Sequence, residues 1–285
     1  MPKNLRVLRR KIRTTESIHQ ITRAMSMVSG VQLRRVQSRV ELSRAYFRRL
    51  TEIMSRVGAG DTTSDHPYLR RNTEEKRIGL ILVAGDRGLC GGYNAGVLRL
   101  ANQFVQDAQV PVSVVPIGVR AVDYVRRNGW TVLDKASMLY EVEDASQASR
   151  IARAIMKHFD TGTIDSLHII YTRFVSTARY VPTYEQLLPI VGDLEETHQA
   201  VEYIYEPNAA EFLHDLLPLA AEARLSYYLL QSLASEHAAR MVAMTTSADN
   251  AEKLGEDLVR ELNRGRQQKI TDEVLEVVSG AEALG

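Results

Sequence analysis

Residues 3–57 read KNLRVLRRKIRTTESIHQITRAMSMVSGVQLRRVQSRVELSRAYFRRLTEIMSRV, with no proline and a single glycine, Gly30. Apolar residues recur at steps of three and four, in the groups Leu5, Leu8, Ile12; Ile18, Ile21, Met25, Val28; Leu33, Val36, Val40; and Phe47, Leu50, Met54, Val57. Such steps are typical of a coiled-coil helix. The stretch predicts a long helix whose stripe changes face between Ile12 and Ile18 and again after Val28.

Residues 219–285 repeat this pattern at the other end of the chain and also lack proline. Their stripe comprises Leu225, Leu229, Leu233, Ala251, Leu254, Leu258, Leu262, Ile270, Val274, Val277, Ala281 and Leu284. Helices over 3–57 and 219–284 would be roughly 80 and 100 Å long at about 1.5 Å per residue. A compact domain of this size has a radius of gyration of about 19 Å, so we expect both helices to project as an antiparallel coiled coil.

Polar residues interrupt the expected seam of this coil. Those at or near seam positions are Thr15, His19, Gln32, Ser235, Thr246 and Asn250. A strongly packed coiled coil would have leucine at these positions, so the sequence predicts a coil whose helices stay paired but are not tightly packed.

The middle of the chain has a different character. Residues 61–76 are polar and without periodicity, whereas Ile78–Ala84 is a buried-strand run. Further strands are expected at 112–117, 130–133, 166–172, 180–190 and 201–205, with helices at 95–106, 119–128 and 145–159. This alternation favours a doubly wound α/β sheet of Rossmann type. The predicted organisation is an N-terminal helix over 1–60, a linker over 61–76, an α/β domain over 77–206 and a C-terminal helix over 207–285.

Composition and charge narrow the possible functions. Apolar residues make up 45% and charged residues 25%, the composition of a globular protein, and no apolar run is long enough to cross a bilayer. Cys90 is the only cysteine, which excludes an intrachain disulfide. Residues 1–60 carry 14 Lys/Arg against 3 Asp/Glu. This basic segment is either a solvated helix face or a docking surface for an acidic partner. Its length argues against a transit peptide.

A glycine-rich motif, GDRGLCGGYN at residues 85–94, stands between an expected strand and an expected helix. Phosphate-binding loops occupy such places, but the motif matches neither G-x-G-x-x-G nor a P-loop. A structural turn that needs positive φ at Gly91 or Gly92 is the favoured interpretation.

Other catalytic or ligand-binding patterns are weak. The seven histidines lack metal-ligand spacing, so we expect no metal site, and nothing predicts a cofactor. Ser235, Glu236 and His237 are consecutive on an expected helix and do not face one another, which argues against a catalytic triad. The basic faces at 6–13 and 34–49 are nearly without aromatic residues, so nucleic acid is not the expected partner.

Several motifs along the chain resemble those of ATP synthase gamma subunits. They are ITRAMSMVS at 21–29, DRGLCGGYN at 86–94, SEHAARMVAM at 235–244, Asp249-Asn250 and RQQKIT at 266–271. Their order and spacing match across essentially the whole chain. The resemblance implies a terminal antiparallel coiled coil with a Rossmann-like domain, the fold that the periodicity also predicts.

The resemblance also implies a function. The chain would be the central rotor shaft of an F-type ATP synthase, a subunit without catalysis of its own that couples ion-driven c-ring rotation to conformational cycling of the catalytic beta subunits. Its partners would be the alpha and beta subunits, the epsilon subunit and the c-ring. It would lie at the cytoplasmic face of a bacterial membrane and contact that membrane only through partners. A nucleotide-binding α/β enzyme with a coiled-coil extension remains the alternative.

Site residues follow from the motifs that carry the resemblance. Met25, Arg266, Gln267 and Thr271 would meet beta-subunit loops, whose acidic character would complement the basic segment. Val274, Val277 and Leu284 would sit in an apolar bearing. Tyr205 and Glu206 would face the c-ring, and Arg87 and Tyr93 would lie near them or near epsilon.

The sequence departs from the family pattern at Gly30, Gly85 and Gly265. If Met25 and Gln267 lie at one level of the coil, Gly30 and Gly265 fall within about a turn of each other. We therefore expect an unusually close or locally softer helix crossing there.

Overall fold

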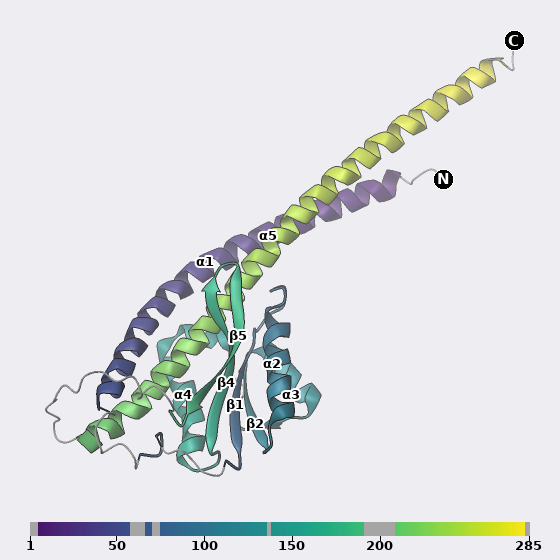
Figure 1. Cartoon of the computed structure of the whole chain (residues 1–285). Helices are drawn as coiled ribbons and strands as arrows, with labels where there is room; N and C mark the ends of the chain where they lie inside the picture. Colours follow the sequence, from purple (N-terminus) through teal and green to yellow (C-terminus); the bar gives the residue numbers. More distant parts are fainter. Residues whose placement is uncertain (1–4, 58–65, 70–74, 136–137, 191–208, 283–285) are drawn as a thin grey trace. The chain divides into compact units, whose positions relative to one another are not determined.

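A computed structural model describes residues 5–57, 66–69, 75–135, 138–190 and 209–282 (Figure 1). By internal contacts the chain divides into two compact units. Unit 1 contains Met1–Ser29 and Met241–Gly285, and unit 2 contains Gly30–Arg240. None of the described helices is long and apolar enough to span a membrane.

Both ends of the chain are continuous helices, as the periodicity predicts. Helix α1 covers Leu5–Val57 and helix α5 covers Ala209–Glu282. Helix α5 begins before the proline-free stretch that starts at residue 219, so Pro218 lies inside it. The proline ring removes one backbone donor there, without ending the helix.

In unit 1, α1 and α5 pair in an antiparallel way. The Ser26 and Thr245 hydroxyl oxygens lie 2.7 Å apart, and a Cβ atom on Gly255 would lie 3.8 Å from Thr15. Further along the pair, a Cβ atom on Gly265 would lie 3.1 Å from Leu5. Residue numbers therefore fall on one helix as they rise on the other, which confirms the antiparallel coiled coil.

Burial along α1 follows one uninterrupted heptad series. The buried or half-buried members are Leu5, Leu8, Ile12, Thr15, His19, Thr22, Ser26, Ser29, Leu33, Val36, Val40, Ser43, Phe47 and Leu50. The predicted change of face is therefore wrong. Polar residues continue the seam, while Ile18, Ile21 and Val28 point to solvent.

Hydrogen bonds within α1 explain why the buried hydroxyls are tolerated. Thr22 Oγ1 donates to the Ile18 carbonyl at 2.8 Å, and Ser29 Oγ donates to the Met25 carbonyl at 2.8 Å. A buried hydroxyl that keeps a hydrogen bond avoids most of its desolvation cost.

Helix α5 contributes a matching series to the unit 1 seam. Its buried or half-buried members are Met241, Met244, Ala248, Ala251, Gly255, Leu258, Leu262 and Gly265. The prediction that placed Leu254 on the stripe is wrong, since its side chain is exposed, and Thr246 and Asn250 also lie off the seam. Small residues fill half of the unit 1 seam positions on each helix.

This register corrects the expected crossing of Gly30 and Gly265. Met25 lies one residue from Ser26, whose partner on α5 is Thr245, and Gly265 lies opposite Leu5. Gln267 is therefore far along the coil from the level of Met25, and the two glycines are not neighbours. The predicted close crossing had assumed the wrong alignment of the helices.

Unit 2 contains a five-stranded sheet in the order β3-β2-β1-β4-β5. Strands β1 (Ile78–Val83), β2 (Val112–Ile117), β3 (Thr131–Val132) and β4 (Ser166–Ser176) are parallel, and β5 (Arg179–Leu188) pairs antiparallel with β4. The connecting helices are α2 (Tyr93–Asp107), α3 (Val119–Asn128), the short 3-10 helix η1 (Leu139–Glu143) and α4 (Ala145–Asp160). This confirms the doubly wound α/β domain.

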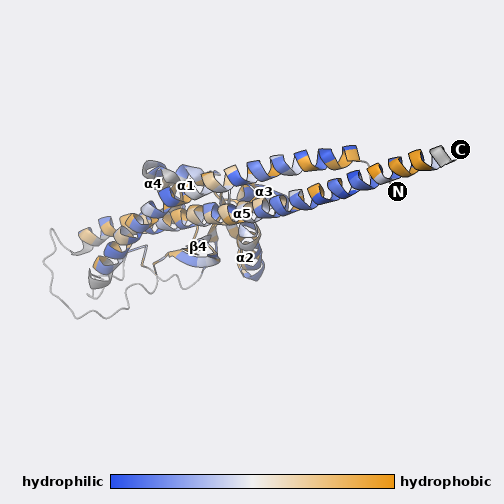
Figure 2. Cartoon of the chain, turned by 90° about the horizontal axis from the view of Figure 1, so that it is seen from above, coloured by the Kyte–Doolittle hydropathy of each residue, from blue (hydrophilic) through white to orange (hydrophobic). Residues whose placement is uncertain are grey.

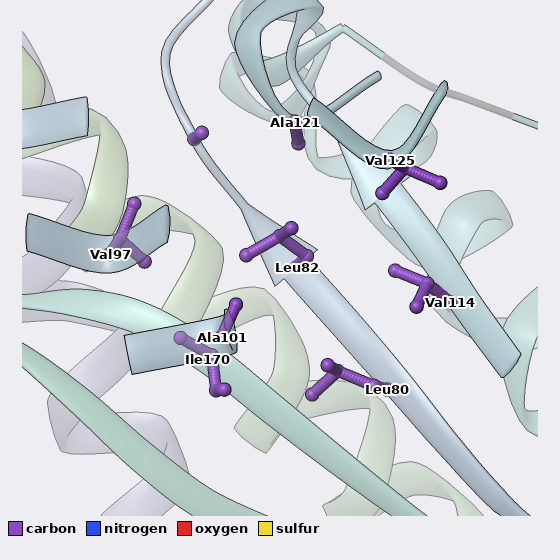
Figure 3. Packing of buried hydrophobic residues seen from close by; sticks show 9 residues of the cluster. Leu80, Leu82, Val97, Ala101, Val114, Ala121, Val125 and Ile170 are labelled. Carbon is purple, nitrogen blue, oxygen red and sulfur yellow. The ribbon is translucent and has the colours of Figure 1, made fainter. Parts of the chain in front are cut away.

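Helices α2 and α3 cover one face of the sheet through a close-packed apolar core (Figure 3). The core joins Leu80 and Leu82 of β1, Val114 of β2 and Ile170 of β4 to Val97, Ala101, Ala121 and Val125 of the two helices. These strand residues alternate with residues that point to the opposite face, where Tyr171 stacks on Tyr228 of α5 with ring centroids 4.5 Å apart.

The parts of α1 and α5 that belong to unit 2 also pair with each other. Phe47 stacks on Tyr227 at 5.7 Å, and Arg44 Nε donates to the Tyr227 hydroxyl at 3.2 Å. Two predicted domain boundaries, near 60 and 206, and the strand expected at 201–205 lie outside the described residues. The predicted boundaries and the predicted projection of the coil stay predictions.

Replacing Gly118 with alanine should strongly destabilise unit 2. Gly118 has φ of 91°, and an added Cβ would lie 1.9 Å from the Ala84 carbonyl oxygen. We expect Gly118→Ala to lower the free energy of unfolding by about 3 kcal/mol or more, measured by urea denaturation. Gly129→Ala is the control, because φ is 65° but no atom lies within 4 Å of the added carbon. Its cost should be about 1 kcal/mol, and equal losses for the two variants would contradict the prediction.

Candidate functional site

The glycine-rich turn, residues Gly85–Asn94, connects β1 to α2. Leu89 and Gly91 have φ of 61° and 55°, so the predicted positive φ lies at Gly91. The Asn94 side chain closes the turn, since its Oδ1 accepts from the Gly85 N–H at 2.8 Å and its Nδ2 donates to the Arg87 carbonyl at 3.4 Å. The motif therefore forms a structural turn.

Asp86 ties this turn to two neighbouring elements. Its carboxylate accepts backbone N–H bonds from Val119 at 3.2 Å, Leu139 at 3.1 Å and Tyr140 at 3.0 Å. These donors stand at the starts of α3 and η1, where backbone N–H groups have no partner within the helix. One carboxylate thus fixes the beginnings of both helices.

Helix α5 bonds directly to the end of β4. Ser232 Oγ accepts from the Thr172 N–H at 3.0 Å, and Ser235 Oγ donates to the Thr172 carbonyl at 3.1 Å. Gln231 Oε1 accepts from the Phe174 N–H at 2.8 Å. We call this contact between α5 and the end of β4 the junction.

Tyr93 is part of the same interior. Its side chain is 1% exposed, and its hydroxyl donates to the Ser232 carbonyl at 3.1 Å. Burial raises the pKa of this phenol well above its ordinary value, so it stays protonated and donates. The Tyr93 side chain therefore packs inside the chain, and the predicted place of this residue near the c-ring contact or near epsilon stays a prediction.

A buried ion pair joins α5 to the glycine-rich turn. Glu236 and Arg240 are 3% and 8% exposed, and Arg240 Nη2 donates to Glu236 Oε1. Arg240 Nε also donates to the Gly88 carbonyl at 3.4 Å. Burial raises the pKa of Glu236, while Arg240 acts in the opposite direction. A buried pair of this kind adds little net stability, but losing one partner leaves a costly isolated charge.

Among the consecutive residues Ser235, Glu236 and His237, the first two bond to different groups, as their helical spacing predicts, and the buried Nε2 of His237 has no hydrogen-bond partner in the part of the chain that the structure describes. Ser235 bonds to Thr172 and to the Gln231 carbonyl, and Glu236 pairs with Arg240. No group of three or more His, Cys, Asp or Glu side chains is placed to hold a metal ion among the residues that the structure describes.

The remaining predicted contact residues lie on surfaces, where they are described. Met25 is half-buried, and Arg87, Arg266, Gln267 and Thr271 are exposed. Val274 and Val277 are 55% and 73% exposed. Leu284, Tyr205 and Glu206 lie outside the described residues. Met25 and Gln267 lie at different positions along the coiled coil.

The end of α5 carries more exposed apolar residues than the predicted apolar bearing contains. Ile270, Leu275 and Val278 join Val274 and Val277, and a shallow groove is lined by four of these five and Glu273. We call the five residues the C-terminal apolar face, which is visible as an orange band in Figure 2. The run of valine, leucine and isoleucine after Ile270 could have shown it.

A second exposed apolar surface lies on α1 and was also missed. It comprises Ile18, Ile21, Met27 and Val28, each at least 45% exposed. The predicted seam wrongly included Ile18, Ile21 and Val28. The spacing of seven residues between Thr15, Thr22 and Ser29 was the signal for the true seam.

Comparisons with known proteins agree on one family. A family model described as ATP synthase matches residues 4–284. The chain is 39% identical to the ATP synthase gamma chain of Dehalococcoides mccartyi strain CBDB1 over 283 residues, covering 99% of each chain. It is also 39% identical to the ATP synthase gamma chain of Desulforamulus reducens over 280 residues, covering 98% of each.

Solved structures share the fold. A chain of the Euglena gracilis mitochondrial ATP synthase aligns with a TM-score of 0.61 and 20% identity, covering 98% of this chain and 94% of that one. A chain of the Tetrahymena thermophila central stalk and c-ring structure aligns with a TM-score of 0.58 and 22% identity, covering 79% and 98%.

The stability of the chain should depend on pH through His237, which lies beside the ion pair. Burial and Arg240 lower the pKa of His237 from 6.5 to about 4. Between these values the unfolded chain binds a proton that the folded chain does not, so stability falls as pH falls from 6.5 to 4. We expect His237→Gln to lose less stability than the unchanged chain between pH 7 and pH 4.5, measured by urea midpoints. Equal losses would contradict this account.

Proposed function

Because the chain belongs to the ATP synthase gamma-chain family, we propose that it is the central rotor shaft of a rotary ATP synthase. Rotation of an ion-driven ring would turn the shaft, and the turning shaft would move catalytic beta subunits through their different nucleotide affinities. Its partners would be the alpha, beta and epsilon subunits and the c-ring. The chain would lie at the cytoplasmic face of a bacterial membrane, held there by these partners.

The observation that carries the proposal is apolar surface left exposed on paired helices. In unit 1, α1 and α5 already bury a seam against each other, yet the C-terminal apolar face remains in solvent. Exposed apolar residues that are contiguous usually mark a surface for a partner. A bearing formed by surrounding subunits would cover this face without requiring a specific polar partner for each side chain.

Charge on α1 supports the same assignment. Residues 1–60 carry 14 basic and 3 acidic side chains, and the exposed apolar surface of α1 lies within this segment. Acidic loops of a surrounding subunit would complement the charge, and electrostatic contacts of this kind tolerate sliding better than deep apolar insertion. Met25, Arg266, Gln267 and Thr271 are the residues that we propose meet those loops.

The α/β domain supports a role without catalysis. Ligands of doubly wound sheets bind at the carboxyl ends of the strands. In this chain Asp86, Tyr93, Ser232 and Glu236 occupy that edge and bond to other groups of the chain. This arrangement favours an anchorage for α5 over the alternative of a nucleotide-binding enzyme, and catalysis would belong to the beta subunits.

Reconstitution tests the assignment directly. The purified chain should show no ATPase activity, whereas its addition to alpha and beta subunits should give an active complex. The measurement is ATP hydrolysis by the mixture with and without the chain. A mixture no more active than alpha plus beta alone would contradict the rotor role, and tight nucleotide binding by the isolated chain would favour the enzyme alternative.

The C-terminal apolar face should be required for this activation. Val274→Asp combined with Val277→Asp introduces two carboxylates where we propose that an apolar bearing surrounds the shaft. Since a buried unpaired charge is costly, we expect about a tenfold or greater loss of activated hydrolysis. The control is Asn263→Asp with Gln268→Asp, which adds the same charge at exposed positions of α5 outside this face. Similar activity of the two double variants would show that the face is not covered.

A further inference from the structure

The carboxyl end of β1 is where a doubly wound fold commonly binds an anion. Backbone N–H groups of the loop after this strand point toward the ligand, and a glycine allows close approach. In this chain the loop is the glycine-rich turn, and the group that reaches it from outside is the side chain of Glu236 on α5.

The contacts of Glu236 are those of a bound carboxylate. Its Oε1 accepts from Arg240 Nη2, and the Arg87 backbone N–H also favours the charged carboxylate, which lowers its pKa. A Cβ atom on Gly85 would lie 2.8 Å from Oε1, so the absence of a side chain at Gly85 leaves room for this approach. An amide, a guanidinium and a glycine thus surround one buried carboxylate.

Arg240 holds the other side of the same site. Its Nε donates to the Gly88 carbonyl at 3.4 Å, so the guanidinium bridges the carboxylate and the turn. Asn94 fixes the turn itself through its bonds to Gly85 and Arg87. The positive group and the backbone donor are therefore positioned by contacts that do not pass through Glu236.

We propose that Glu236 is a built-in carboxylate ligand of the glycine-rich turn, occupying an anion site that would bind a free small carboxylate if this side chain were removed. Glu236 is then a positioning residue that holds the turn against α5. The inference concerns contacts within unit 2 and does not depend on the rotor role, so either can fail without the other.

Chemical rescue with formate tests the proposal in the full chain. Glu236→Ala removes the carboxylate and leaves Arg240 buried without its partner, so the unfolding equilibrium constant should rise by about two orders of magnitude or more. Formate supplies a carboxylate small enough for the vacated space. At ten times its dissociation constant, formate should lower the unfolding constant of the variant about tenfold relative to sodium chloride at equal ionic strength.

Controls separate the site from a general effect of the salt. Asp257→Ala removes the carboxylate of an exposed pair with Arg260 and should not respond to formate, nor should the unchanged chain. A Glu236→Ala chain that responds to formate no more than to chloride overturns the proposal. A response of equal size in the control or in the unchanged chain overturns it as well.

A second variant keeps the test decisive if Glu236→Ala does not fold. Glu236→Gln fills the same volume without the negative charge, so it should fold and should not be rescued by formate. In Glu236→Gln we expect the Arg87 N–H to exchange with deuterium at least tenfold faster than in the unchanged chain, while the amides of β1 keep the protection that they have in the unchanged chain. Unchanged exchange at Arg87 would overturn the proposal.

Discussion

The packing of unit 2 depends on how the end of β4 satisfies its backbone. Strand β4 continues beyond Ile170, the last residue that pairs with β1, and backbone groups buried beyond that point need other partners. Gln231, Ser232 and Ser235 of α5 provide them. Because these bonds involve the backbone of the strand, they fix both the height and the rotation of α5 on the sheet. The same helix α5 pairs with α1 at Phe47 and Tyr227, so its bonds to β4 also determine where this pairing lies on the sheet.

The ion pair of Glu236 and Arg240 restricts the geometry with which α5 contacts the α/β domain. A hydroxyl bond alone permits several side-chain geometries, whereas the guanidinium joins a carboxylate and the Gly88 carbonyl at the same time. Its stability contribution is small, because two charges lose their hydration. Its value lies in the conformation that it selects, in which the glycine-rich turn stays in contact with the unit 2 part of α5.

Long terminal helices and the α/β domain could be predicted from the sequence, whereas the seam of the coil could not. Proline-free ends with apolar residues spaced three and four apart predict helices, irrespective of which face of each helix is buried. Strand-sized apolar runs between helical stretches predict the sheet. The seam failed because Ile18, Ile21 and Val28 are more hydrophobic than Thr15, Thr22 and Ser29 but point outward. A helix that also contacts other proteins carries two apolar faces, and hydrophobicity alone does not say which one meets the other helix. The junction was missed for a related reason, since the partners of Ser232 and Ser235 lie about sixty residues away.

The small residues of the unit 1 seam have a mechanical consequence. Thr15, Thr22, Ala248, Ala251 and Gly255 offer few methyl and methylene groups to interdigitate, so each helical turn gains little dispersion energy from its neighbour. The resistance of two paired helices to winding and unwinding grows with such contacts. This stretch should therefore twist more easily than a leucine-rich coil of equal length, and it would store elastic strain when one end is turned while the other is held.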